Sequence, residues 1–263
     1  MAMGMKRGLA RFFGTMLMLA SMGVARATLY DDAVAYWPLD DNTGTVAQEV
    51  QNDFLDASLV GASWTTPGKF SPAAVDLNGA SNYVVASDYT KSTSAMSVAA
   101  WAWSDTLPTS GDAYHFLLHT ETLFQVLIRP TGALEATFWD SAGAPTTTLT
   151  SADAAFTTGA WHHVAWTFDG STARLYLDGS EVDDGALGGL YGSSSPELGM
   201  GVQLASGVPY GSYPGYWDGK IDEVAVWDRE LSETEVAWFG LIPEPSGLAL
   251  MAAALFMLRK RRG

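Results

Sequence analysis

Short apolar runs separated by turn residues recur along the middle of the chain, from residue 83 to residue 227. In the run 96–103, four apolar residues alternate and would share one face of a strand: Met96, Val98, Ala100 and Ala102. Comparable runs occupy residues 115–119, 123–129, 133–139, 161–168, 172–177 and 220–227. Asp169-Gly170 and Asp178-Gly179 bracket one of these runs, and Asp-Gly between such runs favours hairpins. The pattern predicts an all-β domain, either a sandwich or a jelly roll.

One helix is expected after the last of these runs. Ser232-Glu233-Thr234-Glu235 is a capping box, in which Ser232 accepts the N–H of Glu235 while the Glu235 side chain reaches back to Ser232. The apolar residues 236–239 follow, and Gly240 ends the helix signal. The expected element is therefore a short helix close to the C-terminus.

Composition narrows the chemistry that this domain can carry. The chain has 263 residues, and 48% of them are hydrophobic, which excludes global disorder. It contains no cysteine, which excludes a disulfide scaffold, a zinc–thiolate site and a thiol nucleophile. The formal net charge of −15 argues against a nucleic-acid partner, because phosphate binding requires clustered Lys and Arg.

The basic residues are concentrated at the two ends of the chain. Of the 14 Lys and Arg residues, eight lie within residues 1–27 and 259–262. Residues 28–243 contain six basic and 28 acidic residues, which gives this body a charge of −22. The two ends therefore differ chemically from the body, and each has its own interpretation.

Residues 1–27 have the three parts of a secretory signal peptide. Lys6, Arg7 and Arg11 give a positive start, residues 12–22 are mostly apolar, and Ala25-Arg26-Ala27 has the form of a cleavage site. The alternative is an N-terminal membrane helix, but the apolar run is short for a span of about 20 residues. We expect export, with cleavage by signal peptidase after Ala27.

Residues 243–263 also have three parts in a fixed order. Pro243-Glu244-Pro245 precedes the uncharged apolar segment 248–258, and Arg259-Lys260-Arg261-Arg262 follows it. The basic end would hold the segment at the cytoplasmic face of the inner membrane. Together the three parts resemble a PEP-CTERM sorting signal. The resemblance implies transient anchoring in the inner membrane, processing by an exosortase, and transfer to the cell surface or extracellular matrix; a simple tail anchor is the alternative.

Four segments of the body, in order, resemble the signatures of LamG-like, concanavalin A-like jelly-roll domains. They are Tyr36-Trp37-Pro38-Leu39-Asp40, then Gly68-Lys69-Phe70 with Ala74–Gly79, then Trp161–Ala165 with Leu175–Gly179, and finally Asp218–Val224 with Trp227–Ser232. The resemblance implies an antiparallel two-sheet jelly-roll sandwich over residues 28–242, with one short helix before the sorting tail. Trp37 and Trp161 are expected in its core, and Arg229 is expected to pair with an acidic neighbour such as Asp222 or Asp228.

A structural calcium ion is one candidate feature of the acidic body, since Ca²⁺ takes oxygen ligands. Related jelly rolls hold such an ion where the first and last strands meet. The corresponding candidate ligands are Asp40 and Asp41 on the first signature and Asp222 on the last. The alternative is a solvated acidic edge in which Asp222 is hydrogen-bonded to the backbone.

A polysaccharide ligand is the second candidate, because aromatic side chains on exposed loops suit sugar binding. The segment 210–217 contains three Tyr and one Trp together with Gly and Pro, which favours an exposed loop. Tyr210 and Tyr213 are the expected ligand contacts. Tyr216 and Trp217 have an alternative role, in which they seal the sandwich.

No catalytic residue is assigned from the sequence. Glycosidases of this fold carry a Glu-x-Asp-x-x-Glu pattern, and the nearest match, Glu181-Val182-Asp183, lacks the final Glu. His162 and His163 are adjacent on a predicted strand, so they point to opposite faces and cannot easily share a metal ion. We expect a non-enzymatic exported protein that binds glycan or another surface polymer; the alternatives are a glycoside hydrolase and a purely structural surface protein.

Overall fold

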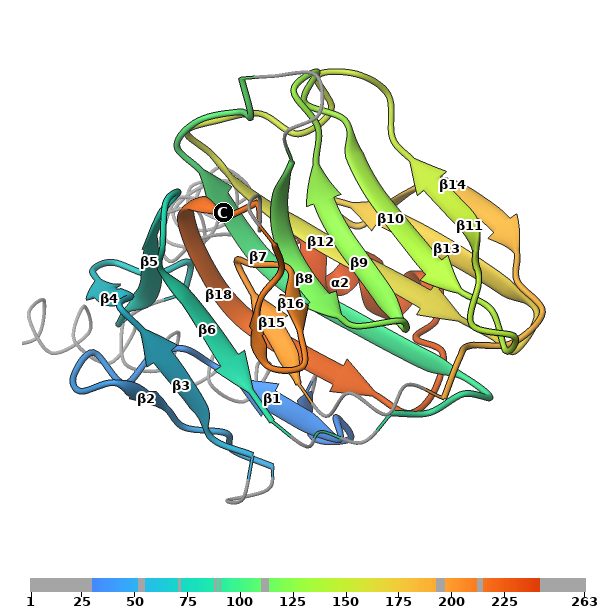
Figure 1. The fold of residues 1–263 in the computed structure, drawn as a ribbon, viewed down its shortest axis with the longest axis horizontal. Coiled ribbons are helices and arrows are strands. Elements are labelled where there is room, and N and C mark those ends of the chain that lie inside the picture. Colours follow the sequence, from blue (N-terminus) through green and yellow to red (C-terminus); the bar gives the residue numbers. More distant parts are fainter. Residues whose placement is uncertain are drawn as a thin grey trace, which may run out of the picture.

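Two large antiparallel sheets face each other in the computed structural model, which describes residues 30–51, 55–70, 72–87, 89, 91–109, 114–192, 197–211 and 215–241 (Figure 1). The first, sheet A, is built from β1 (Ala35–Trp37), β4 (Ser63–Thr65), β5 (Ala74–Asn78), β7 (Met96–Ser104), β12 (Trp161–Phe168), β13 (Thr172–Leu177), β14 (Ser180–Ala186) and β18 (Asp218–Trp227). The second, sheet B, is built from β2 (Val46–Ala47), β3 (Ala57–Val60), β6 (Tyr83–Ala86), β8 (His115–Thr120), β9 (Phe124–Ile128), β10 (Leu134–Trp139), β11 (Pro145–Thr150) and β15 (Leu198–Met200).

Strands that are far apart in the chain become neighbours in both sheets. Sheet A has the order β14-β13-β12-β7-β18-β5-β4, with β1 also paired to β18, and sheet B has the order β11-β10-β9-β8-β15-β6-β3-β2. The last strand, β18, thus lies in the middle of sheet A, between β7 and β5. The antiparallel two-sheet sandwich predicted from the sequence is confirmed. The predicted signal peptide, its cleavage site after Ala27 and the motif Pro243-Glu244-Pro245 lie outside the described residues.

The core between the sheets follows the predicted alternation. Trp37 is buried in this core. The four residues predicted to share one face of β7 are buried there too: Met96, Val98, Ala100 and Ala102. The prediction for Trp161 is wrong, because Val164 faces the core from β12 and a residue three positions away on a strand faces the opposite side. Trp161 is therefore only partly buried, on the outer face of sheet A.

A smaller apolar cluster covers part of the outer face of sheet A. Helix α2 (Glu233–Leu241) lies behind this sheet, on the side away from sheet B (Figure 1). Val236 and Phe239 of the helix pack with Tyr36 and Trp227 of the sheet, and the ring of Tyr30 stacks on that of Tyr36 with centroids 3.9 Å apart. None of the helices within the described ranges has the length and apolar character that a membrane span requires.

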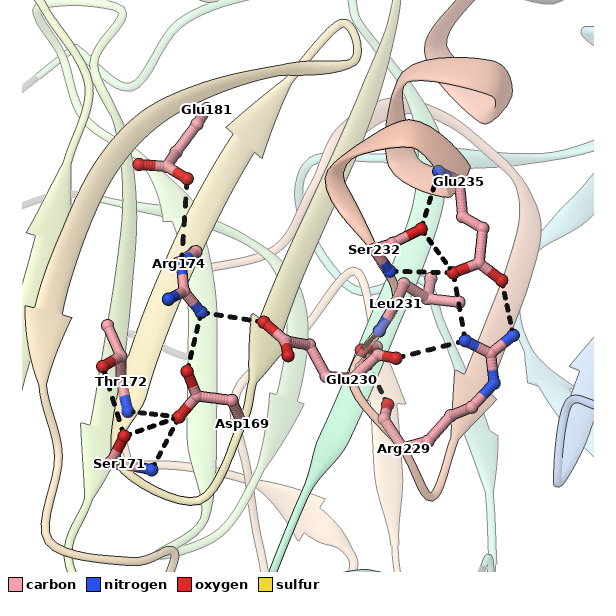
Figure 2. Close-up of polar contacts among 11 residues, drawn as sticks. Asp169, Ser171, Thr172, Arg174, Glu181, Arg229, Glu230, Leu231, Ser232 and Glu235 are labelled. Atoms are coloured by element: carbon pink, nitrogen blue, oxygen red, sulfur yellow. Dashed lines mark hydrogen bonds and ion pairs between the residues drawn. The ribbon is translucent and has the colours of Figure 1, made fainter.

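The start of α2 has the predicted capping box. Glu235 Oε2 accepts the N–H of Ser232 at 2.8 Å, and Ser232 Oγ accepts the N–H of Glu235 at 3.3 Å (Figure 2). Arg229 contacts the same Glu235 carboxylate and also Asp32, whose Oδ2 accepts its Nε–H at 2.6 Å. The expected pairing of Arg229 with an acidic neighbour is confirmed, but Asp222 and Asp228 are wrong as the partners, because this side chain reaches the helix start and the N-terminal segment instead.

Candidate ligand-binding surface

The hairpin of β16 (Leu204–Ala205) and β17 (Val208–Pro209) packs against sheet B and ends at Tyr210. Leu204 is buried, and its N–H donates to His119 Nδ1 at 3.2 Å. Burial lowers the pKa of His119 to about 4, so the ring is a neutral acceptor at pH 7. Gly199 of β15 allows this approach, because a Cβ there would lie 2.9 Å from Leu204 Cγ.

Tyr210 is 56% exposed, as expected of a ligand contact, and its backbone N–H donates to the carbonyl of Gln203 at 2.9 Å. Tyr213, the other predicted contact, lies outside the described residues. Trp217 is fully buried in the core and donates its Nε1–H to the carbonyl of Trp103 at 3.0 Å. The alternative role of Trp217 in sealing the sandwich is thus confirmed, while the ligand role of Tyr210 stays a prediction.

The three candidate calcium ligands all accept backbone hydrogen bonds. Asp222 is fully buried on β18, where its two carboxylate oxygens accept the N–H groups of Lys69 at 2.7 Å and Glu223 at 3.0 Å. Asp40 Oδ1 lies 3.5 Å from the N of Ala73, and Asp41 Oδ2 accepts the N–H of Gln48 at 3.0 Å.

The backbone partners of Asp40 and Asp222 are thus only four positions apart in the chain, while Asp41 contacts another part of the chain. Among the described residues, no three carboxylate or imidazole side chains form a group that could hold a metal ion. The calcium site therefore stays a prediction.

Sequence reasoning missed a row of side chains that crosses the outer face of sheet A. Trp161 of β12 is paired in register with Trp103 of β7, Trp103 with Lys220 of β18, and Lys220 with Asp76 of β5. Because paired residues on antiparallel strands point to the same face, the four side chains form one line. The alternation along 96–103 already placed Trp103 on the face opposite the core, but only the register reveals its neighbours.

Aromatic and charged groups are in close contact along this row. The rings of Trp103 and Trp161 meet edge to face, with centroids 6.0 Å apart. Lys220 Nζ lies 4.5 Å from the ring centroid of Trp103, and Trp103 Nε1–H donates to Asp105 Oδ1 at 2.8 Å. One indole thus contacts a second indole, an ammonium group and a carboxylate.

Carboxylates outnumber the single cation around this row. The pKa of Asp76 is raised, chiefly by partial burial and further by the nearby carboxylates of Asp105 and Asp218, while Lys220 opposes the shift. Asp218 also accepts a hydrogen bond from the Thr106 hydroxyl. Three carboxylates and one ammonium group therefore lie close together at this row.

The nearest match to a glycosidase motif is occupied by contacts within the fold. On β14, Glu181 Oε2 lies 3.9 Å from Arg174 Nε, and Asp183 Oδ2 accepts the N–H of Thr150 at 2.8 Å. The second contact joins edge strand β14 of sheet A to edge strand β11 of sheet B. Arg174 also contacts Asp169 and Glu230, so Glu181 belongs to a surface ion-pair network (Figure 2).

His162 and His163 point to opposite sides of β12, as predicted. His162 Nδ1 lies 2.8 Å from Asp178 Oδ2, and its Nε2 lies 2.8 Å from the hydroxyl of Thr157. His163 is buried on the other side, between Trp101 and Phe239. Burial lowers the pKa of His163 to about 3, so it is neutral at pH 7.

The class of protein follows from a match to a known family. The concanavalin A-like lectin/glucanases superfamily matches residues 78–237, which include strands of both sheets from β6 to β18, and the chain belongs to this family. Among curated proteins, none matches the chain.

Solved structures show the same fold at low sequence identity. Domain 4 of AbnA, a GH43 extracellular arabinanase from Geobacillus stearothermophilus solved in complex with arabinotriose, is 19% identical with a TM-score of 0.57, over 80% of this chain and 98% of that one. The binding domain of Paraclostridial Mosquitocidal Protein 1 is 15% identical with a TM-score of 0.64, over 81% of this chain and 52% of that one. The botulinum neurotoxin serotype D binding domain is 14% identical with a TM-score of 0.60, over 80% of this chain and 52% of that one. The match thus covers about half the length of each toxin domain.

Proposed function

We propose that this protein is exported and binds glycan or another surface polymer in the cell envelope or extracellular matrix, in adhesion or in an exopolysaccharide or biofilm matrix. The observation that carries the proposal is a lectin/glucanase-family sandwich that presents aromatic side chains at its surface, at Tyr210 and at the Trp103–Trp161 pair. The arabinotriose complex of the AbnA domain supports a carbohydrate as the ligand.

A glycan array probed with the full-length chain tests this function, with and without EDTA. We expect wild-type protein to bind at least one polysaccharide class. A variant that carries Tyr210→Ala and Tyr213→Ala reports whether the predicted loop contributes. Absence of binding to every glycan, by protein with a wild-type melting temperature, would contradict the proposal and favour the purely structural alternative.

Export is the second half of the proposal, and its support comes from the two ends of the sequence. The resemblance of residues 243–263 to a sorting signal implies processing by an exosortase after transient anchoring in the inner membrane. Replacing Pro243, Glu244 and Pro245 by Ala should leave the protein in the membrane fraction of its host. Unchanged release to the cell surface, measured by fractionation and immunoblot, would contradict this part.

The glycoside hydrolase alternative has one observation in its favour. Asp76 has a raised pKa, lies within electrostatic range of Asp105 and Asp218, and belongs to the row that also holds Trp103 and Trp161. Paired carboxylates of different pKa are the groups that glycosidases use. Release of reducing ends from a polysaccharide panel, abolished by Asp76→Asn, would establish this activity and displace the non-enzymatic proposal.

A further inference from the structure

We propose that the outer face of sheet A carries a glycan-binding platform, formed by Trp161, Trp103, Lys220 and Asp76 with Asp105 beside them, and that it takes a glycan without acidic groups. This inference rests on the proposed function, because it names the surface and the class of ligand. It concerns a face of the molecule different from the one that carries Tyr210.

The register sets the shape of the platform. Four neighbouring strands contribute one side chain each, and strands lie about 4.8 Å apart, so the row extends for about 14 Å. The row is long enough to contact several sugar rings of an extended chain. The same sheet is covered by α2 at another position, where Phe239 packs on Trp227. Trp103 and Trp161 remain partly exposed.

The chemistry of the row matches that of a sugar ring. The apolar C–H face of such a ring packs on an aromatic ring, and a few convergent polar groups fix its hydroxyls. Here Asp105 is held beside the indole by the Trp103 Nε1–H bond, and Lys220 Nζ lies over the same ring. Carboxylate oxygens accept hydrogen bonds from sugar hydroxyls, and the ammonium group donates them.

The distribution of cations argues against an acidic glycan. The body has six basic residues, all in the described ranges, and each already contacts a carboxylate or an aromatic ring. The pairs are Lys69 with Trp101, Lys91 with Tyr89, Arg129 with Glu135, Arg174 with Asp169, Lys220 with Trp103, and Arg229 with Glu235.

The charge balance at the platform itself points the same way. Asp76, Asp105 and Asp218 place three carboxylates against the one ammonium group of Lys220. A polyuronate or a sulfated chain would therefore approach a surface of its own sign. A chain of uncharged sugar rings meets no such repulsion when it approaches the exposed parts of the Trp rings.

Isothermal titration of the full-length protein tests the platform with neutral hexasaccharides and with oligogalacturonates of the same length. We expect neutral chains to bind, and Trp103→Ala and Trp161→Ala each to weaken binding at least about tenfold, equivalent to about 1.4 kcal/mol. Trp238→Ala is the matched control, because Trp238 is 64% exposed on α2 outside the row, and it should bind as wild type. Asp105→Asn keeps the shape of the side chain and should weaken binding without loss of folding, which is checked by the melting temperature.

The outcomes separate the two proposals. If wild-type protein binds no glycan, the proposed function fails. If wild-type protein binds neutral chains but folded Trp103→Ala, Trp161→Ala and Asp105→Asn variants bind equally well, the assignment of binding to the platform is wrong, while the proposed function stands. Oligogalacturonate binding as tight as that of neutral chains would overturn the assignment of ligand class.

Discussion

The Glu235 carboxylate accepts hydrogen bonds from both terminal nitrogens of Arg229, with Nη2 2.7 Å from Oε1 and Nη1 3.2 Å from Oε2 (Figure 2). The same carboxylate also closes the capping box with Ser232. These hydrogen bonds hold the carboxylate in its ionised form, and the pKa of Glu235 falls to about 2, with the Arg229 bond as the largest cause. One side chain thus joins the start of α2 to the loop that follows β18.

Glu235→Gln should therefore lower the free energy of unfolding at pH 7 by about 1 kcal/mol, a value reduced for the partial exposure of both partners. The depressed pKa stabilises the fold above the unfolded-state pKa, near 4.5, and this contribution is lost as pH falls toward 2. Urea unfolding at pH 7 and pH 3 should show the variant's deficit shrink in acid. Glu233→Gln, an exposed acid on the same turn, is the control; an equal deficit there would contradict the specific role of Glu235.

His163 should also make the fold sensitive to acid, because burial disfavours its protonated form. Its folded-state pKa of about 3 lies below the unfolded value of 6.5, so only the unfolded state takes up the proton as pH falls through this range. Stability should decline by up to about 1.4 kcal/mol per pH unit from this residue.

His163→Phe should flatten the fall in stability between pH 6.5 and pH 4, which is measured by urea unfolding at several pH values. The buried His119, with a pKa of about 4, contributes in the same direction and should leave a residual slope in the variant. A slope unchanged from wild type would show that His163 does not titrate as the structure implies.

Gly199→Ala should displace the β16–β17 hairpin. A Cβ at this position would lie 2.9 Å from both Leu204 Cγ and the carbonyl oxygen of Val202, so the hairpin must move. Crowding of this kind lowers the free energy of unfolding by about 1–3 kcal/mol. The melting temperature should fall, and glycan binding through the Trp103–Trp161 row should remain. Gly188→Ala is the control, because a Cβ there meets no atom within 4 Å, and its melting temperature should be unchanged.

The predicted calcium site is tested by thermal melting in calcium and in EDTA. If Asp40, Asp41 and Asp222 hold the ion, calcium should raise the melting temperature, because a ligand that binds only the folded state stabilises it. Asp222→Asn should remove the effect. If calcium and EDTA give the same melting temperature, the metal prediction is wrong, and the backbone contacts of Asp222 with Lys69 and Glu223 are structural.

Local patterns in the sequence predicted many of the elements but not the platform, and strands such as β11 and β14 were not among those predicted. The alternation through Met96 and Val98 and the capping box at Ser232 are local signals, and both are confirmed. The row that joins Trp161 to Trp103 and Lys220 depends on register between strands distant in the chain. Register is a property of the whole sheet, so no single segment reveals it.

Arg229 and Trp161 are two residues whose surroundings differ from those predicted from the sequence, each for its own reason. Arg229 reaches Asp32, a partner 197 positions away in the chain, which local spacing does not identify. Trp161 is large and aromatic, which favours the core, but its position relative to Val164 places it on the other face of β12. Packing between distant segments decided the partner of Arg229, whereas the alternation along β12 decided the face of Trp161.

The indole N–H signals of Trp103 and Trp161 provide the most direct test of a glycan-binding face on this sandwich. In a ¹H–¹⁵N NMR titration of the full-length protein with a neutral hexasaccharide, both signals should shift in proportion to occupancy. The Trp103 signal should respond most, because its N–H is bonded to Asp105. The signals of Trp238 and of the buried Trp37 should stay in place. Saturable binding that leaves the signals of Trp103 and Trp161 unmoved would contradict the account.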